Sequence, residues 1–177
     1  MSEDIFKNYV HELNDSILLL REKKKLNATL MIIYSGIDIM ASLGIPEEQE
    51  EVTKHDYISW VNDFMLNKSE LSCDAEDLYS ARCGILHTGR PESKMTKDKK
   101  AKLYCYGYIN PVRYNKELSK THKDAIFINI DHLITAFSKG ILSFLKSLLN
   151  DIERLRIFDQ RLRKILCIYP LPPRQPK

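Results

Sequence analysis

The chain has 177 residues, of which 44% are hydrophobic, so it is long enough to form one globular domain with a substantial core. Its 27 Lys and Arg residues against 24 Asp and Glu residues leave a net charge of +3, which excludes a basic nucleic-acid-binding surface spread over the whole protein. The four cysteines form no C-x-x-C pair, which argues against a zinc ribbon or a dithiol redox site. We expect reduced core thiols.

The N-terminal sequence predicts a cytoplasmic protein. It reads MSEDIFKNYV and carries acidic residues where a secretory signal would carry basic ones. The most apolar stretch, Leu30 to Ile45, is interrupted by Asp38 and falls short of the roughly 18 apolar residues that a membrane span requires. It therefore predicts a buried helix and no membrane partner.

Apolar residues at helical spacing predict a first helix from Ile5 to Leu20. A second helix would be capped by Asn27 and stopped by Gly44 and the proline that follows. Its largely apolar faces predict a place at the centre of the core. A third helix is predicted over residues 55–66.

A fourth helix is predicted to begin at a cap formed by Ser72 or Asp74 and to end at Gly89 and Pro91. The lysine-rich stretch that follows, residues 94–102, is either a solvated connector or a surface that holds RNA phosphates. The connector is the more ordinary interpretation.

Two short strands are predicted, over residues 103–109 and 125–130, and we expect them to pair as a small β-hairpin inserted at residues 102–130. Tyr104, Tyr106 and Tyr108 would share one face of the first strand, where they either cover the core or stack on RNA bases. Covering the core is the more common role of such a face.

Asp131 can cap a final helical region that breaks near Asn150. Prolines then leave residues 170–177 as an extended tail. The expected architecture is therefore mainly α, with a single domain over residues 1–169.

Two predicted helices each carry one charged residue within an apolar face. Arg82 lies in the middle of such a face on the fourth helix, and Asp38 does so on the second. An isolated buried charge is very costly, so we expect these two residues to lie close together, or each to face a ligand or a second protomer. The simplest interpretation of Arg82 is a structural salt bridge with Asp38.

His87 follows Arg82 by five residues, in the last turn of the predicted helix. The negative end of the helix dipole would stabilise its protonated form there, either as a helix cap or as a proton shuttle. An Arg beside a titratable His suits phosphodiester cleavage, because the Arg stabilises charge on the phosphate oxygens while the His moves a proton. RNA is the natural substrate, since it supplies its own 2′-hydroxyl nucleophile, and no metal or cofactor is needed.

The sequence LYSARCGILHTGRP around these residues resembles the HEPN signature, in which an Arg is followed four to six residues later by a His near a helix end. The resemblance implies a bundle of four to five helices and a homodimer in which two such pairs line one cleft. It also implies a metal-independent RNA endonuclease, in a bacterial toxin or defence system, with RNA or nucleotide as ligand and a cognate antitoxin or defence partner. Arg82 and His87 would be the catalytic residues and Asp38 the auxiliary polar residue.

Many active HEPN proteins have Asn, Asp or His directly after the Arg, where this chain has Cys83, a weaker hydrogen-bonding group. The alternative is a catalytically inactive HEPN-fold dimer that binds nucleotide, RNA or protein. A third interpretation, a structural dimer or antitoxin-like partner, needs no chemistry in a cleft.

Overall fold

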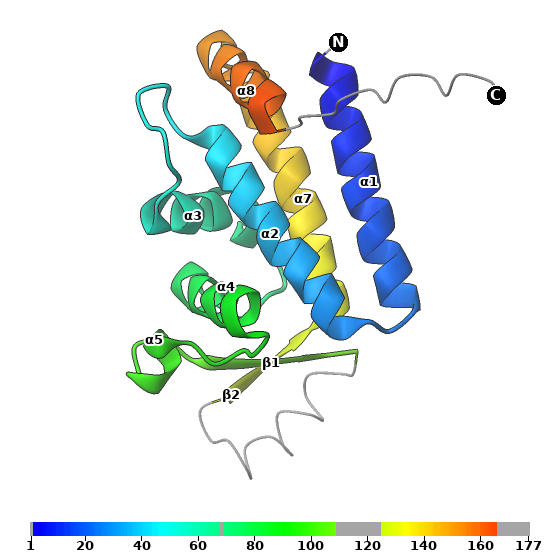
Figure 1. Cartoon of the computed structure of the whole chain (residues 1–177), viewed down its shortest axis with the longest axis vertical. Helices are drawn as coiled ribbons and strands as arrows, with labels where there is room; N and C mark the ends of the chain where they lie inside the picture. The colour runs from blue at the N-terminus through cyan, green and yellow to red at the C-terminus, as the bar shows by residue number, and fades with distance from the viewer. Residues whose placement is uncertain (1, 68, 109–124, 166–177) are drawn as a thin grey trace, which may run out of the picture.

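The structure is a computed structural model that describes residues 2–67, 69–108 and 125–165 (Figure 1). Helices make up most of it, which confirms the predicted mainly α fold. In chain order they are α1 (Ser2–Glu22), α2 (Leu26–Gly44), α3 (Lys54–Trp60), α4 (Ala75–Thr88), α5 (Lys94–Lys97), α7 (Ile130–Leu148) and α8 (Ile152–Ile165), with a π-helical segment, η1 (Val61–Leu66), continuing α3. The two strands are β1 (Leu103–Gly107) and β2 (Ala125–Asn129).

Helix α2 occupies the centre of the bundle, as its apolar composition predicted. It contacts α1, α3, α4, α7 and α8, and Ile33, Tyr34 and Ile37 are completely buried (Figure 1). Among the described residues it is the single helix long and apolar enough to cross a membrane, and half of its most apolar stretch is buried in this fold. Packing of the core accounts for that composition.

Two of the predicted helix caps are wrong. Helix α2 begins one residue before Asn27, with Lys25 at the N-cap and no side-chain hydrogen bond there. Helix α7 is capped by Asn129, whose side chain accepts a hydrogen bond from the Asp131 backbone N–H at 2.8 Å. Both Asn and Asp favour the N-cap position, so local sequence does not distinguish neighbouring candidates.

The predicted third helix is confirmed in extent but not in form. It begins at Lys54, after a capping box made by Thr53 and Asp56, and changes from α to π geometry at Val61. A π-helical segment is rare, and local periodicity does not reveal it. Further along, the predicted connector contains the short helix α5, with Ser93 as its cap.

The predicted β-hairpin is wrong, because β1 and β2 pair in parallel, with Leu103 opposite Ala125 and Gly107 opposite Asn129. A hairpin joins antiparallel strands through a short turn, whereas parallel strands need a connection of about a dozen residues or more. The intervening residues, 108–124, are sufficient for that connection. Position Ile109 of the predicted first strand lies outside the described residues, and Ile130 belongs to α7 instead of the second strand.

A buried carboxylate attaches the sheet to α4. Asp77 accepts hydrogen bonds from the Tyr104 hydroxyl at 2.8 Å and from the Lys102 backbone N–H at 2.9 Å. Tyr104 is completely buried, and the hydroxyl of Tyr106 is hydrogen-bonded to that of Tyr34 on α2. These two tyrosines therefore cover the core, and Tyr104 cannot stack on a base.

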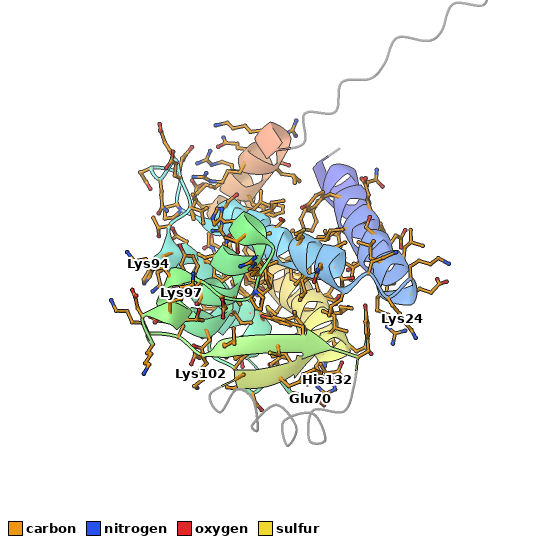
Figure 2. All side chains as sticks on the ribbon, turned by 60° about the horizontal axis from the view of Figure 1, so that its bottom comes forward. Lys24, Glu70, Lys94, Lys97, Lys102 and His132 are labelled. Atoms are coloured by element: carbon orange, nitrogen blue, oxygen red, sulfur yellow. The ribbon has the colours of Figure 1, made fainter. Side chains whose placement is uncertain are left out.

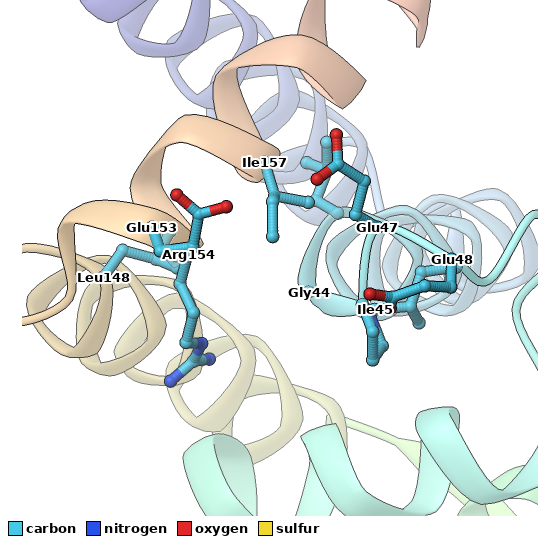
Figure 3. A pocket seen from close by; sticks show the side chains of 10 residues that line it. Gly44, Ile45, Glu47, Glu48, Leu148, Glu153, Arg154 and Ile157 are labelled. Carbon is cyan, nitrogen blue, oxygen red and sulfur yellow. The ribbon is translucent and has the colours of Figure 1, made fainter.

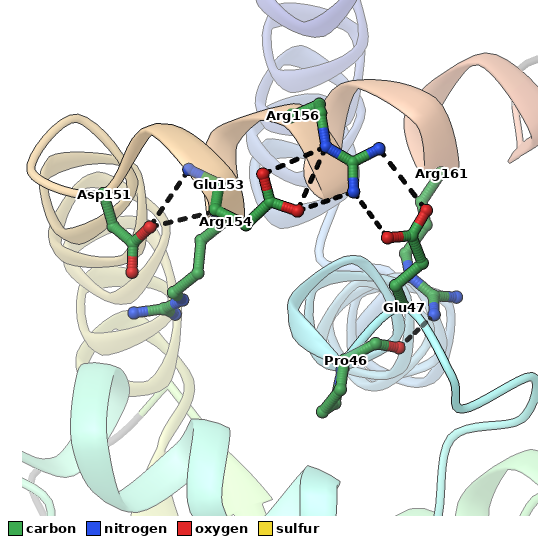
Figure 4. A network of polar contacts seen from close by, with 7 residues as sticks. All are labelled: Pro46, Glu47, Asp151, Glu153, Arg154, Arg156 and Arg161. Carbon is green, nitrogen blue, oxygen red and sulfur yellow. Dashed lines mark hydrogen bonds and ion pairs between the residues drawn. The ribbon is translucent and has the colours of Figure 1, made fainter.

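The final helical region breaks between α7 and α8, as predicted near Asn150, and α8 then folds back over the end of α2. Arg156 forms ion pairs with Glu47 and Glu153, and Arg161 donates to the backbone carbonyl of Pro46 (Figure 4). These contacts hold the loop after α2 against α8. The predicted tail, residues 170–177, and the domain end at residue 169 lie outside the described residues.

Candidate functional site

Helix α4 carries the HEPN-like motif, and both of its ends are defined by local interactions. The Asp74 side chain accepts a hydrogen bond from the Asp77 backbone N–H at 2.8 Å, and Gly89 ends the helix in the left-handed conformation with φ at 67°. Gly84 faces the chain that returns after the helix, and a Cβ there would lie 2.4 Å from the Arg90 carbonyl oxygen. Glycine at this position allows the returning segment to pack directly against α4.

Arg82 on α4 and Asp38 on α2 form an ion pair, which confirms the prediction that they lie close together. The Arg82 Nε atom lies 2.8 and 3.1 Å from the two carboxylate oxygens of Asp38, and Nη2 lies 2.7 Å from Oδ2. The two side chains are 22% and 20% exposed, respectively. The pair therefore lies at the edge of the core, within reach of solvent.

The third nitrogen of the guanidinium, Nη1, has only a weak partner. It lies 3.9 Å from the sulfur of Cys83, a long contact to a poor acceptor. The Tyr79 ring centroid lies 5.9 Å from the guanidinium carbon, close enough for a cation–π interaction. Arg82 is thus held by Asp38 and Tyr79 while Nη1 remains available to an added acceptor.

Burial raises the pKa of the Asp38 carboxyl, and the hydrogen bonds and charges of Arg82, together with the charge of His87, offset this only in part. Burial lowers the pKa of Arg82, but the hydrogen bonds and charge of Asp38 outweigh it and leave the pKa raised. The desolvation of Asp38 is therefore not fully compensated by its partner.

His87 is exposed in the last turn of α4. Gly89 and Thr88 satisfy the terminal carbonyls instead, since the Gly89 N–H donates to the Ile85 carbonyl and the Thr88 hydroxyl to the Gly84 carbonyl. Among the described residues the His87 side chain has no hydrogen-bond partner, so the helix-cap interpretation is not supported. The imidazole is near enough for its charge to act on Asp38.

Tyr57 was missed as a member of this cluster. Its ring packs edge-on against Tyr79, with centroids 5.3 Å apart, and its buried hydroxyl has no hydrogen-bond partner among the described residues. In the sequence Tyr57 is one of several apolar positions of the third helix, so only its tertiary position distinguishes it.

The lysine-rich stretch lies on the other side of α4 from Arg82. The Ser80 hydroxyl is hydrogen-bonded to that of Ser93, at the start of α5, and Arg82 follows Ser80 by about 200° around the helix. Figure 2 shows Lys94, Lys97 and Lys102 near α5 and the start of β1. These lysines are not positioned to hold a phosphate that contacts Arg82.

Two further pockets lie away from the Arg82–Asp38 pair. One, between the loop after α2 and the start of α8, has a volume of about 310 Å³ and is lined by Glu47, Glu48, Glu153 and Arg154 (Figure 3). The other is an apolar groove between α1, α7 and α8, beside the exposed side chains of Leu149 and Ile152. Neither includes a residue of the predicted site.

The three described cysteines are free thiols, each partly exposed, and Cys167 lies outside the described residues. The described part of the chain contains no cluster of three His, Cys, Asp or Glu side chains arranged to hold a metal ion. The structure therefore pairs Arg82 with Asp38 as predicted, places His87 five residues after Arg82 on the same helix, and adds Tyr57, Tyr79 and Cys83 to the surroundings of the pair.

Comparison of the chain with protein-family models, with curated proteins and with solved structures finds no significant match.

Proposed function

We propose that this chain is a metal-independent RNA endonuclease of the HEPN class, acting through Arg82 and His87 in a cytoplasmic bacterial toxin or defence system. The observation that carries the proposal is the Arg82 Nη1 atom, which has only a weak contact to Cys83, on the helix whose last turn carries the exposed imidazole of His87. A guanidinium nitrogen open to a new acceptor and a titratable imidazole are the two groups that phosphodiester cleavage needs.

In the proposed reaction the 2′-oxygen of one ribose attacks the adjacent phosphorus, and the bond from phosphorus to the 5′-oxygen of the next nucleotide breaks. Arg82 stabilises the negative charge that develops on the non-bridging oxygens. Protonated His87 gives its proton to the departing 5′-oxygen, while solvent accepts the proton of the 2′-hydroxyl. The products are a 2′,3′-cyclic phosphate and a 5′-hydroxyl.

Asp38 acts in this proposal as a positioning residue. Its bond to Nε and Nη2 fixes the plane of the guanidinium and directs Nη1 away from α2. A fixed guanidinium loses little conformational entropy when a phosphate binds.

The alternative proposal is a HEPN-fold dimer that binds RNA or nucleotide without cleaving it. The strong contact of Arg82 with Asp38 favours it, because the carboxylate already neutralises the charge that a transition state would use. Cys83 beside the Arg favours it as well, since a thiol is a poor hydrogen-bonding group for a substrate oxygen. We propose a homodimer in both cases, which light scattering of the purified protein would measure.

To test the proposal, the purified wild-type protein is incubated with total RNA in EDTA, and the 3′ ends of any new RNA fragments are analysed. The same experiment is done with His87→Ala and with the matched control His55→Ala, an exposed histidine at the start of α3. Folding and oligomeric state of all three are measured first. Neither exposed imidazole contributes to the core, so we expect the variants to unfold within about 0.5 kcal/mol of wild type.

Cyclic phosphates produced by wild type and His55→Ala, and absent with His87→Ala, would support the nuclease. If the folded wild type leaves RNA intact but binds it through Arg82, the binding protein is the better description. If RNA is neither cut nor bound, both proposals fail.

A further inference from the structure

A third pocket lies between the first turns of α2, the C-terminal end of α4 and β1, and its lining includes neither Arg82 nor Asp38. Its volume is about 240 Å³, and its lining includes Asn27, Leu30 and Met31 from α2, Ile85 from α4, Pro91 and Tyr106. Pockets that enclose drug-sized ligands measure roughly 300–1,000 Å³, so this one suits a single planar ring.

The pocket and the ion pair share one face of α2. Asn27, Met31, Tyr34 and Asp38 follow one another at intervals of four, three and four residues, which places all four within a narrow stripe of the helix surface. Seven residues separate Met31 from Asp38, which corresponds to roughly 10 Å along the axis. The pocket and the charged pair therefore lie on the same side of α2, with the buried side chain of Tyr34 between them.

On α4, too, residues that line the pocket lie on the same side of the helix as Arg82. Ile85 and Gly89 both line the pocket, and both lie on the side of the helix that carries Arg82, within about 60° of it. His87 lies between them in the sequence and is exposed, but it is about 160° around the helix from each of them. A group bound in the pocket would thus lie about one or two helical turns along α4 from Arg82.

The chemistry of the lining suits an aromatic heterocycle. Leu30, Ile85 and Pro91 supply apolar walls, and the thioether of Met31, a residue that is 39% exposed, can lie against a flat ring. The Asn27 side-chain amide is exposed and has no hydrogen-bond partner among the described residues. An amide offers both a donor and an acceptor, which is what the edge of a nucleobase requires.

We infer that this pocket binds the nucleobase of an RNA residue whose phosphate contacts Arg82. The inference rests on the proposed function, since it assumes an RNA phosphate at Arg82. It adds that base identity is read at Asn27, so that the protein discriminates among nucleotides at one position.

The test measures binding of the four ribonucleoside 3′-monophosphates to the intact wild-type chain by NMR, following the methyl signals of Met31 and Ile85. Inorganic phosphate is the reference ligand, because it can reach Arg82 but cannot fill the pocket. Met31→Trp fills the pocket from an exposed position, and Leu18→Trp, at a residue of α1 that is 56% exposed and does not line the pocket, is the matched control.

We expect nucleotides, and not phosphate alone, to shift both methyl signals. We also expect Met31→Trp to weaken nucleotide binding by about tenfold or more, because the Trp side chain would occupy the space that the nucleobase needs. Leu18→Trp should leave nucleotide binding unchanged. Asn27→Asp should change the order of preference among the four bases, since a carboxylate accepts but cannot donate.

The inference is overturned if phosphate alone produces the same shifts or if Met31→Trp binds nucleotides as tightly as Leu18→Trp does. Its failure is distinguishable from failure of the nuclease, because binding is measured without cleavage. If RNA is cleaved in EDTA but nucleotides do not shift the methyl signals of Met31 and Ile85, the proposed base-binding role of the pocket is wrong and the nuclease proposal stands. If nucleotides bind in a way that Asn27→Asp changes, but no RNA is cleaved, the base-binding role of the pocket is supported and the nuclease proposal is wrong.

Discussion

Arg82 on α4 pairs with Asp38 on α2, 44 residues earlier in the chain, through two guanidinium nitrogens at distances of 2.7 to 3.1 Å. The pair joins two helices that also pack against each other. Because each side chain is about one-fifth exposed, the pair is neither a surface salt bridge nor a fully desolvated one. The change in the free energy of unfolding should therefore depend on whether one partner or both partners of the pair are replaced.

The first prediction concerns Arg82→Met and Asp38→Leu, singly and together. Each single variant leaves one partly buried charge without its partner, and we expect a loss of about 1–3 kcal/mol in the free energy of unfolding. The double variant should recover much of that loss, since two apolar side chains of similar length can pack where the pair was. Urea unfolding of the four proteins measures the coupling, and strictly additive losses would contradict a direct interaction.

The second prediction concerns the pH dependence that Asp38 brings to stability. Its pKa lies above the ordinary value of 3.8 because burial raises it, so the folded state binds the proton more tightly than the unfolded state does. The contribution of Asp38 to the free energy of unfolding is therefore largest below pH 3.8 and declines as the pH rises through the folded pKa. In Asp38→Asn, which has no titrating carboxyl there, this decline should disappear.

Arg82→Met supplies the matching control for this titration. Removing the guanidinium removes the contributions of Arg82 that lower the pKa of Asp38 and leaves only that of His87, so the pKa should rise further than in wild type. NMR titration of the Asp38 side-chain carbon measures both values. A lower pKa in the variant would show that Arg82 does not stabilise the carboxylate.

The third prediction concerns the N-terminus of α4, for which the sequence offers both Ser72 and Asp74. The Asp74 carboxylate is the group that accepts the Asp77 N–H. Asp74→Ala should therefore cost about 1 kcal/mol of unfolding free energy, the usual effect of losing an N-cap. Ser72→Ala, an exposed position outside the helix, should change stability by less than about 0.5 kcal/mol. Equal effects in thermal unfolding would contradict the assignment of the cap.

The fourth prediction concerns Gly84→Ala. The new Cβ would lie 2.4 Å from the Arg90 carbonyl oxygen and 2.6 Å from that of Glu92, both backbone atoms that cannot rotate away. We expect a loss of about 2–3 kcal/mol, since the segment after α4 must move. Gly44→Ala is the control, because its Cβ would approach only the Phe144 side chain, at 3.3 Å. Comparable stability of the two variants in urea would show that the segment after α4 is displaced easily.

The helical periodicity of the sequence predicted the main helices because each buries one face against the rest of the bundle. This held for α2, whose central place followed from its apolar faces, and for the break between α7 and α8. It failed where neighbouring residues have equal local preferences, as at Asn27 and Asp131, and where hydrogen bonding changes within a helix, as at Val61.

The sequence also predicted that Arg82 and Asp38 lie close together, or that each faces a ligand or a second protomer, because a charge in an apolar helix face needs a partner. The structure confirms the first of these alternatives. The sequence predicted the two strands but gave them the wrong relative direction, a hairpin instead of a parallel pair, since alternation shows which faces are apolar and not the path of the connecting chain. Only the tertiary structure decided that the lysine-rich stretch lies on the other side of α4 from Arg82. The same is true of the packing of Tyr57 against Tyr79, and of the pocket on the side of α2 that also carries Asp38. Such relationships depend on the angle and register at which helices pack, which no single segment encodes.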